Sequence, residues 1–282
     1  MKYLNLGCGR RFHRDWINLN FASTGDGVIA HDLNQGIPYP DDVFDVVYHS
    51  HVLEHFPKSS AQPFLQECYR VLRPSGILRV VVPDLEQIAR LYLSALEQAT
   101  AGSDEWANRY NWIMLEMYDQ SIRNRPGGEM LDYLYQDHLR DEAFLIERWG
   151  TEAKNLIAEG RSLQSLPVQP APHPLKRSLN RLYAFFVDSH YRRDVLLKLL
   201  LKQDYTALQI GRFRQSGEIH QWMYDRYSLS QLLQQCGFEA VTQQTATTSK
   251  IANWQSFLLD TESDGKVYKP DSLFMEAVKS VC

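Results

Sequence analysis

The first third of the chain alternates short apolar runs with turns and contains one stretch of helical pattern. Runs of strand length occur near residues 3–6, 16–19, 27–30, 44–48 and 76–82. The last run is apolar at nearly every position, which is typical of a central strand buried on both faces. Before it, apolar residues from Phe64 to Leu72 recur at helical spacing. This alternation predicts an α/β fold with a doubly wound, mostly parallel sheet.

From about residue 85 to residue 217 the pattern is helical instead. Stretches such as 106–122 and 142–158 are long and periodic, and no strand-like run separates them. A parallel sheet does not need an insertion of this size, so we expect residues 87–218 to form a large helical insertion. Four prolines between Leu166 and Pro174 preclude a regular helix there and divide the insertion into two helical parts.

The end of the chain returns to the mixed pattern. Ser228 and Gln231 form a capping-box pair, and Gly237 suits the position just after a helix, so a helix is predicted between them. Closing strands are expected near 238–243 and 256–259. The sheet domain should then comprise residues 1–86 and 219–262, with residues 263–282 as a C-terminal tail.

Composition narrows the classes of protein. The chain has 282 residues, 44% of them hydrophobic, with 30 Lys and Arg against 34 Asp and Glu. It lacks the basic excess of a nucleic-acid binder, so we expect no nucleic-acid partner. The four cysteines include no C-x-x-C pair, and we find no N-terminal signal or apolar span of about eighteen residues. These features favour a cytoplasmic protein.

One segment departs from the overall charge. Residues 176–214 contain nine Lys and Arg against three Asp and Glu, a local charge of +6. The stretch from Arg192 to Lys202 resembles a basic helix that lies on a membrane surface. We therefore expect an anionic partner, or a peripheral contact with the inner membrane face, for residues 176–214. The alternative is a packed helix with a hydrated basic edge.

Two glycines follow the first predicted strand. Within Leu4–Gly9, Gly7 and Gly9 would let a ligand approach the backbone without meeting a Cβ atom. A dinucleotide fingerprint would need a third glycine at position 12, where this chain has Phe12. A nicotinamide-dependent dehydrogenase is therefore disfavoured.

The chain resembles a known family through six short segments in a fixed order. They are Leu4–Gly9, Ala30–Leu33, Phe44–Tyr48, His51–His55, Arg70–Gly76 and Val82–Asp84. Together they closely resemble class I S-adenosylmethionine-dependent methyltransferases of the type 11 group, and the likeness resumes from His220 to Phe238. Within that group, the chain is similar to predicted methyltransferases of bacterial glycan and lipopolysaccharide biosynthesis, whose tails resemble Lys269–Ala277.

This resemblance implies a Rossmann-like fold, S-adenosylmethionine as cofactor, and methyl transfer to a small-molecule or glycan-linked acceptor, above all at oxygen. The insertion would then be an acceptor-binding cap. The positions that correspond to the family's cofactor site are Leu6, Gly7, Cys8, Gly9, Asn20, Asp32, Leu33 and Ser50. Residues 7–9 would lie beside the methionine moiety. Asp32 and Leu33 would bracket the adenine, whose amino group can donate to a carboxylate.

Three positions depart from the family pattern. Asn20 stands where an acid usually binds the ribose hydroxyls, Asn5 where many relatives have Asp, and Arg11 where a third glycine is usual. An amide still accepts one hydrogen bond, so we expect the cofactor affinity to fall rather than vanish. The same departures leave open a non-catalytic interaction module with this fold.

The segment from His51 through Glu54 to His55 allows two interpretations. On a helix, H-x-x-E-H is the inverted zinc-protease motif, and these residues would serve a zinc metallohydrolase. In the methyltransferase interpretation, the helix starts at the carboxyl edge of the sheet, where ligands bind in open α/β folds. His51 then faces the methyl donor or the acceptor, and no metal site is expected.

Methyl transfer to a hydroxyl requires an aligned acceptor and a group that removes its proton. A neutral histidine suits that task at cytosolic pH, and His51 is the first candidate for the base. His220 and Asp84 are the alternatives, because each stands where the insertion rejoins or leaves the sheet. Tyr224 and Asp225 would either hold substrate hydroxyls or only pack before the next helix.

Overall fold

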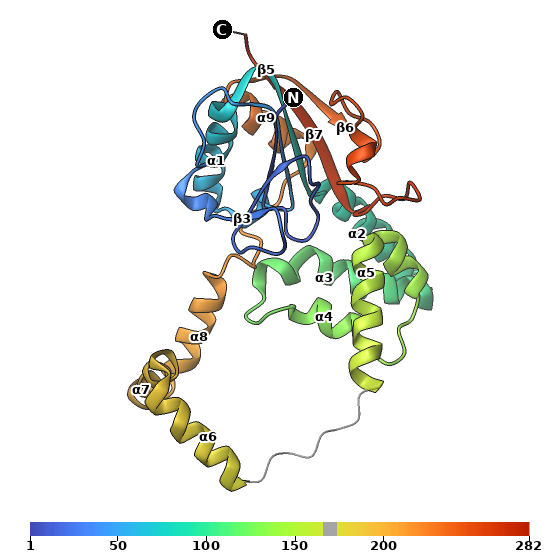
Figure 1. Ribbon diagram of the computed structural model, residues 1–282. Helices are drawn as coiled ribbons and strands as arrows, with labels where there is room; N and C mark the ends of the chain where they lie inside the picture. Colours follow the sequence, from blue (N-terminus) through green and yellow to red (C-terminus); the bar gives the residue numbers. More distant parts are fainter. Residues whose placement is uncertain (166–173, 282) are drawn as a thin grey trace.

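The computed structural model describes residues 1–165 and 174–281 of the chain. Seven strands form one sheet in the order β3-β2-β1-β4-β5-β7-β6 (Figure 1). They are β1 (Tyr3–Leu6), β2 (Ile17–Asn20), β3 (Val28–Ala30), β4 (Phe44–Ser50), β5 (Leu72–Pro83), β6 (Phe238–Gln244) and β7 (Ser272–Lys279). Neighbours pair in parallel except at β7, which is antiparallel to both β5 and β6. The predicted α/β fold with a doubly wound, mostly parallel sheet is confirmed.

The two faces of the sheet are covered differently. On one face, α1 (Lys58–Val71) and α9 (Arg226–Gln235) bury side chains such as Leu65 and Leu229 in a core shared with the strands. On the other face, Tyr48 of β4 packs against Trp254 of the 3-10 helix η3 (Trp254–Phe257), at 5.2 Å between ring centroids. Loops thus supply an aromatic cluster that covers this second face.

The closing strands correct the sequence-based prediction. The strand expected near 256–259 is wrong, because Asn253 and Leu258 have positive φ angles and the chain turns through η3 between them. Its place in the sheet is taken by β7, which lies inside the residues expected to form a tail. The sheet domain therefore extends to Lys279.

Helix α9 begins earlier than the pattern predicted. Asp225 is its N-cap, and its carboxylate accepts from the backbone N of Ser228 at 2.7 Å. The capping box is formed by Asp225 and Ser228, rather than by Ser228 and Gln231. Tyr224, just before the cap, is buried in the core. Packing and capping thus account for Tyr224 and Asp225, although a role in holding substrate stays untested.

The first part of the insertion is a helical unit with its own core. It comprises α2 (Leu85–Thr100), α3 (Asp104–Ile122), α4 (Gly128–Leu134) and α5 (Glu142–Ser165). Trp112, Leu134 and Trp149 lie at the centre of that core. Figure 1 shows these helices at the end of the sheet toward which the parallel strands run. The unit therefore stands next to the edge where a ligand is expected.

The second part of the insertion, which we call the arm, is made of three helices that extend away from the rest (Figure 1). They are α6 (Pro174–Val187), α7 (Ser189–Leu201) and α8 (Asp204–Arg214). The arm rejoins the body at Arg214, whose guanidinium donates to the carbonyl O of Ser121 at 3.2 Å. Residues 166–173 of the predicted proline-rich loop lie outside the described residues. Within the described ranges, no helix combines the length and apolarity needed to cross a bilayer.

Candidate active site

The loop after β1 forms the floor of the site. Gly7 and Gly9 have positive φ angles of 62° and 53°. A Cβ atom on Gly7 would lie 2.3 Å from Cγ2 of Val52, so only glycine fits beneath that side chain. The chain then passes to β2 without a helix, and the backbone N of Cys8 donates to the carbonyl O of Leu19 at 3.1 Å. The backbone of residues 7–9 is thus held tightly against the sheet.

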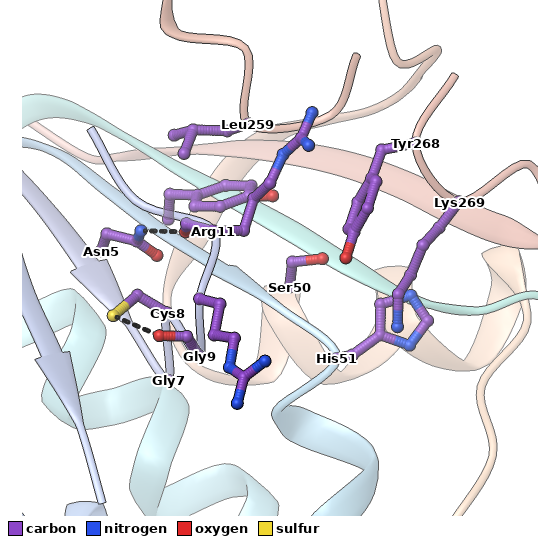
Figure 2. Close-up of a pocket in the computed structure, with 12 residues that line it drawn as sticks. Asn5, Gly7, Cys8, Gly9, Arg11, Ser50, His51, Leu259, Tyr268 and Lys269 are labelled. Carbon is purple, nitrogen blue, oxygen red and sulfur yellow. Dashed lines mark hydrogen bonds between the residues drawn. The ribbon is translucent and has the colours of Figure 1, made fainter. Parts of the chain in front are cut away.

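Two pockets meet at Gly7 and His51. The first has a volume of about 210 Å³, and its lining includes Gly7, Cys8, Gly9, Ser50 and His51 (Figure 2). The second has a volume of about 220 Å³, and its lining includes Gly7, Asn20, Asp32, Leu33 and His51. Seven of the eight predicted cofactor residues therefore line one of these pockets. The eighth, Leu6, is fully buried in the core beneath the loop and would support the site without lining it.

Asp32 gives the second pocket its acidic group. Its Oδ1 atom accepts from the backbone N and the side-chain Nδ2 of Asn34, at 3.0 and 2.9 Å, and so caps the 3-10 helix η1 (Leu33–Gln35). These hydrogen bonds, the backbone one first, lower the pKa of the Asp32 carboxyl. Phe21 and Phe56 add aromatic surface to the same pocket. An ionised acceptor beside flat apolar walls suits a ring that carries an amino group.

The two asparagines that depart from the family pattern hold the loop in place. Oδ1 of Asn20 accepts from the backbone N of Gly9 at 3.2 Å. Asn5 is buried, and its Nδ2 donates to the carbonyl O of Arg11 and to Oδ1 of Asn18, each at 3.2 Å. A carboxylate at position 5 could donate neither bond, so the amide fits this short loop better than the usual acid. The sequence did not reveal the partnership of Asn5 with Asn18.

The first pocket also contains residues that the sequence analysis did not assign to it. They include Arg10, Arg11, Tyr48, Leu259, Tyr268 and Lys269. Nζ of Lys269 lies 2.8 Å from Oε2 of Glu152 on α5, so the helical unit reaches this pocket. Burial alone would lower the pKa of Lys269, but the nearby carboxylates of Glu152 and Asp271 have the larger effect together, so the net pKa is raised. A charged amine therefore stands next to His51, as Figure 2 shows.

His51 directly follows β4 and has a backbone conformation that is uncommon outside glycine. Its φ angle is 54°, in the left-handed region that histidine enters more readily than most residues. Nδ1 lies 3.2 Å from Oε1 of Glu54, and Nε2 lies 2.9 Å from Oγ of Ser272. The carboxylate beside Nδ1 assigns the ring proton to that atom and leaves the lone pair on Nε2.

Glu54 is the centre of a buried histidine cluster. Burial raises the pKa of the Glu54 carboxyl, but His51, His55 and His220 outweigh it and bring the pKa to about 2. One ligand atom each of Glu54, His55 and His220 lies within 4.8 Å of the others, so these three could hold a metal ion. The cluster joins His51 and His220, two candidate bases that are far apart in the sequence.

The backbone conformation from His51 to His55 contradicts the zinc-protease interpretation. Residues 53–55 form a single 3-10 turn, η2 (Leu53–His55), and His51 precedes it in the left-handed region. His51 and His55 therefore do not share one face of an α-helix, as the inverted zinc motif requires.

The two alternative bases lie behind the pockets. His220 is only 5% exposed, packs edge-on against His55, and has a pKa that burial lowers to about 3. Asp84 caps α2, and its carboxylate accepts two backbone N–H groups at 3.0 and 3.2 Å. Neither residue lines the two pockets, whereas His51 lines both. The geometry thus favours His51 as the base, and roles for His220 and Asp84 stay predictions.

Comparison with known proteins agrees with the sheet. Residues 16–80, from the start of β2 into β5, match the family model of a methyltransferase domain. No curated protein shows significant sequence similarity to the chain. The chain thus carries a methyltransferase domain on a Rossmann-like α/β fold. It is an enzyme of the S-adenosylmethionine-dependent class, and S-adenosylmethionine is its cofactor.

Several solved structures are distantly similar. A methyltransferase from Archaeoglobus fulgidus that depends on S-adenosylmethionine is 12% identical over 99% of this chain and 86% of that chain, with a TM-score of 0.38. A complex between the Haloferax volcanii Trm112 methyltransferase activator and a putative methyltransferase gives 10% identity over 100% and 82%, with a TM-score of 0.39. A Mesorhizobium loti methyltransferase covers 29% of this chain and 47% of its own at 17% identity, with a TM-score of 0.24. The assignment rests on the domain match and the sheet order.

The residues present fit this cofactor. Gly7 lets the loop pack against Val52, whereas the Cβ position of Gly9 is open, with nothing within 4 Å, so a ligand could approach the backbone there. Asp32 would accept from the adenine amino group, and residues 7–9 would lie beside the methionine moiety. Arg10 and Lys269 would then meet the cofactor carboxylate with opposite charge.

Proposed function

We propose that the protein transfers the methyl group of S-adenosylmethionine to a hydroxyl of a small-molecule or glycan-linked acceptor, with His51 as the general base. The observation that carries this proposal is the position of His51. His51 lines both pockets, and Gly7 is the other residue that the two linings share. The sulfonium that carries the methyl group joins the adenosyl and methionine parts of the cofactor. If these two parts occupied the two pockets, the methyl group would lie near this junction.

The proposed division of labour follows from the cluster behind His51. The cofactor supplies a sulfonium whose methyl carbon is already electrophilic. The carboxylate of Glu54, 3.2 Å from Nδ1 of His51, would keep the ring proton on Nδ1 and leave the lone pair on Nε2. Nε2 would take the proton of the acceptor hydroxyl as its oxygen accepts the methyl group that the cofactor supplies. Nε2 now lies 2.9 Å from Oγ of Ser272, and this contact would have to open for Nε2 to reach an acceptor hydroxyl.

This mechanism predicts a loss of turnover without a loss of cofactor. His51→Ala should lower turnover by about a hundredfold or more, because a general base contributes about that much. His51→Asn tests the same loss with a side chain that tolerates the left-handed backbone. Turnover is measured as transfer of a labelled methyl group to a panel of monosaccharides and nucleoside-diphosphate sugars. Cofactor affinity is measured by calorimetry and should hardly change.

His138→Ala is the matched control, since His138 is exposed and lines neither pocket. Full turnover in both His51 variants would remove His51 from the mechanism. His220→Ala and Asp84→Asn would then show whether another residue takes its place. Amino sugars in the same panel separate oxygen from nitrogen methylation. A neutral amine already has a free lone pair and needs no general base, whereas a hydroxyl must lose its proton to one.

A further inference from the structure

The arm exposes large apolar side chains at regular spacing. On α6, Leu179, Leu182, Tyr183 and Phe186 recur three or four residues apart, so they lie on one face of the helix. On α7, Leu199 and Leu200 are exposed three and four residues after Leu196, which is 48% exposed. The other six are between 57% and 78% exposed. Folded proteins seldom leave so much apolar surface in water unless it contacts a partner or a membrane.

The packing of the arm does not need these side chains. Among residues 179–187 of α6, Ala184 and Phe185 are the ones that are partly covered, and Tyr205 of α8 is buried. Tyr205 donates its hydroxyl to Asp194 of α7, and Nζ of Lys198 lies 5.9 Å from the Tyr205 ring centroid. Arg192 of α7 donates to the carbonyl O of Phe185 on α6 at 3.4 Å, so these contacts join the three helices without the exposed stripe, which remains available for a partner.

The charge of the arm indicates what the partner is. The segment carries the local charge of +6, while the whole chain is at −4. Among the arm cations whose side chains the structure describes, only Arg212 forms an ion pair, with Asp194 at 2.9 Å. Arg181, Arg193 and Lys202 thus form no ion pair among the described residues. A second copy of the arm would repel this surface, because both would carry the same positive charge.

We infer that the arm docks on a lipid bilayer that contains anionic headgroups. The leucines and aromatics would enter the boundary between headgroups and acyl chains, and the free Lys and Arg would meet lipid phosphates. The arm rejoins the body three residues before Gly217, which lines the second pocket. Docking would therefore bring the pocket close to the membrane surface. This inference stands independently of the acceptor and of the role of His51.

Co-sedimentation with lipid vesicles tests the inference with the full chain and no cofactor or acceptor. We compare phosphatidylcholine vesicles with vesicles in which about a quarter of the lipid is phosphatidylglycerol. The protein should bind the anionic vesicles and lose most of that binding when salt rises from about 0.1 M to about 1 M. Phe186→Ser combined with Leu199→Ser and Leu200→Ser should weaken binding about tenfold or more, since it removes apolar area from the stripe.

Two further variants separate apolar from electrostatic contributions. Arg193→Gln with Lys202→Gln should weaken binding to anionic vesicles several-fold and reduce its salt dependence. The matched control replaces Leu93, Tyr118 and Leu163 by Ser, because these side chains are also at least half exposed but lie on α2, α3 and α5. It should bind vesicles like the unchanged protein.

Any one of three results would overturn the inference. The first is that the unchanged protein does not bind anionic vesicles, and the second is that the stripe variant binds them as well as the control does. The third is that the stripe proves to be a dimer contact. Light scattering after size-exclusion chromatography reports the last, as a mass that falls from dimer to monomer in the stripe variant alone. Circular dichroism of each variant shows that the helices are retained.

Discussion

At the scale of single residues, Asp32 combines two tasks that one substitution can separate. Its carboxylate caps η1 and is also the acidic group of the second pocket. Asn at this position can still cap the helix through its own Oδ1, whereas it loses the negative charge. Comparison of Asp32→Asn with Asp32→Ala therefore distinguishes damage to the turn from damage to the ligand contact.

We predict that Asp32→Ala weakens cofactor binding by about 1–3 kcal/mol, the usual range for loss of a charged hydrogen bond. Asp32→Asn should lose most of the same affinity while it keeps the thermal stability of the unchanged protein. Calorimetric titration with S-adenosylmethionine measures the affinity of each variant, and thermal unfolding measures its stability. Asp26→Ala is the control, because Asp26 is an exposed acid that lines neither pocket. An unchanged affinity in folded Asp32→Ala would show that the adenine binds elsewhere.

His49 sets the response of the fold to acid. It is fully buried in β4, and its two ring nitrogens have no hydrogen-bond partner among the described residues. Burial lowers its pKa from 6.5 to about 4. Between these two values the unfolded chain binds a proton that the folded chain excludes, so stability falls as the pH drops from 6.5 toward 4. His220 acts in the same direction, whereas Glu54 matters only below its unfolded pKa of 4.5.

We predict that His49→Leu reduces the loss of stability between pH 6.5 and pH 4. The unchanged protein should lose up to about 3 kcal/mol of its free energy of unfolding through His49 over that pH window. The variant should keep that part, because leucine does not titrate and fits beside Phe64, the aromatic neighbour of His49. Urea unfolding at a series of pH values gives the two curves, with His138→Leu as an exposed control. Parallel curves for His49→Leu and the unchanged protein would contradict the assignment.

At the scale of elements, one arginine ties the second face of the sheet together. Arg79 of β5 is fully buried and pairs with Asp260 at 2.7 Å and with Glu276 of β7 at 2.7 Å. Its guanidinium also lies 4.4 Å from the Trp254 ring centroid. Tyr48, which lines the first pocket, donates to Asp260 at 2.6 Å. The network thus fixes both the loop that covers this face and one wall of the site.

We predict that Arg79→Met destabilises the protein by about 3–5 kcal/mol, because it leaves two buried carboxylates without their cation. Arg90→Met is the control, since Arg90 pairs with Glu86 on the exposed surface of α2 and should cost less than about 1 kcal/mol. Urea unfolding measures both. Equal small losses in the two variants would mean that the Asp260 and Glu276 carboxylates find other partners.

This network also explains which elements the sequence could predict. The apolar run of β5 and the periodic faces of α1 and α9 are local patterns, and they appeared where expected. Strand β7 carries Glu276 at a fully buried position, which interrupts its apolar pattern. The residue that makes this burial tolerable is Arg79, nearly 200 positions earlier, and no local pattern links the two. The strand was therefore missed for a physical reason.

At the scale of the whole molecule, the site was predictable where it follows the parallel strands. The glycine loop, Asn20, Asp32, Ser50 and His51 all stand at carboxyl ends of strands or just beyond, which topology brings to one edge. Tyr268 and Lys269 come from the segment before β7, and Glu152 comes from the insertion. Their place in the pocket depends on how the later parts of the chain return to the sheet, which local patterns do not encode.

The position of β7 has a consequence for the order of folding. The strand lies between β5 and β6 in the sheet, yet it follows every other strand in the sequence. Until residues 272–279 have been synthesised, β5 keeps an unpaired edge and Arg79 lacks the carboxylate of Glu276. An open strand edge invites pairing with other chains. The helices of the insertion can form while the chain grows, but the sheet closes only at the last strand, so the nascent protein passes through a stage at which that edge must be kept from aggregation.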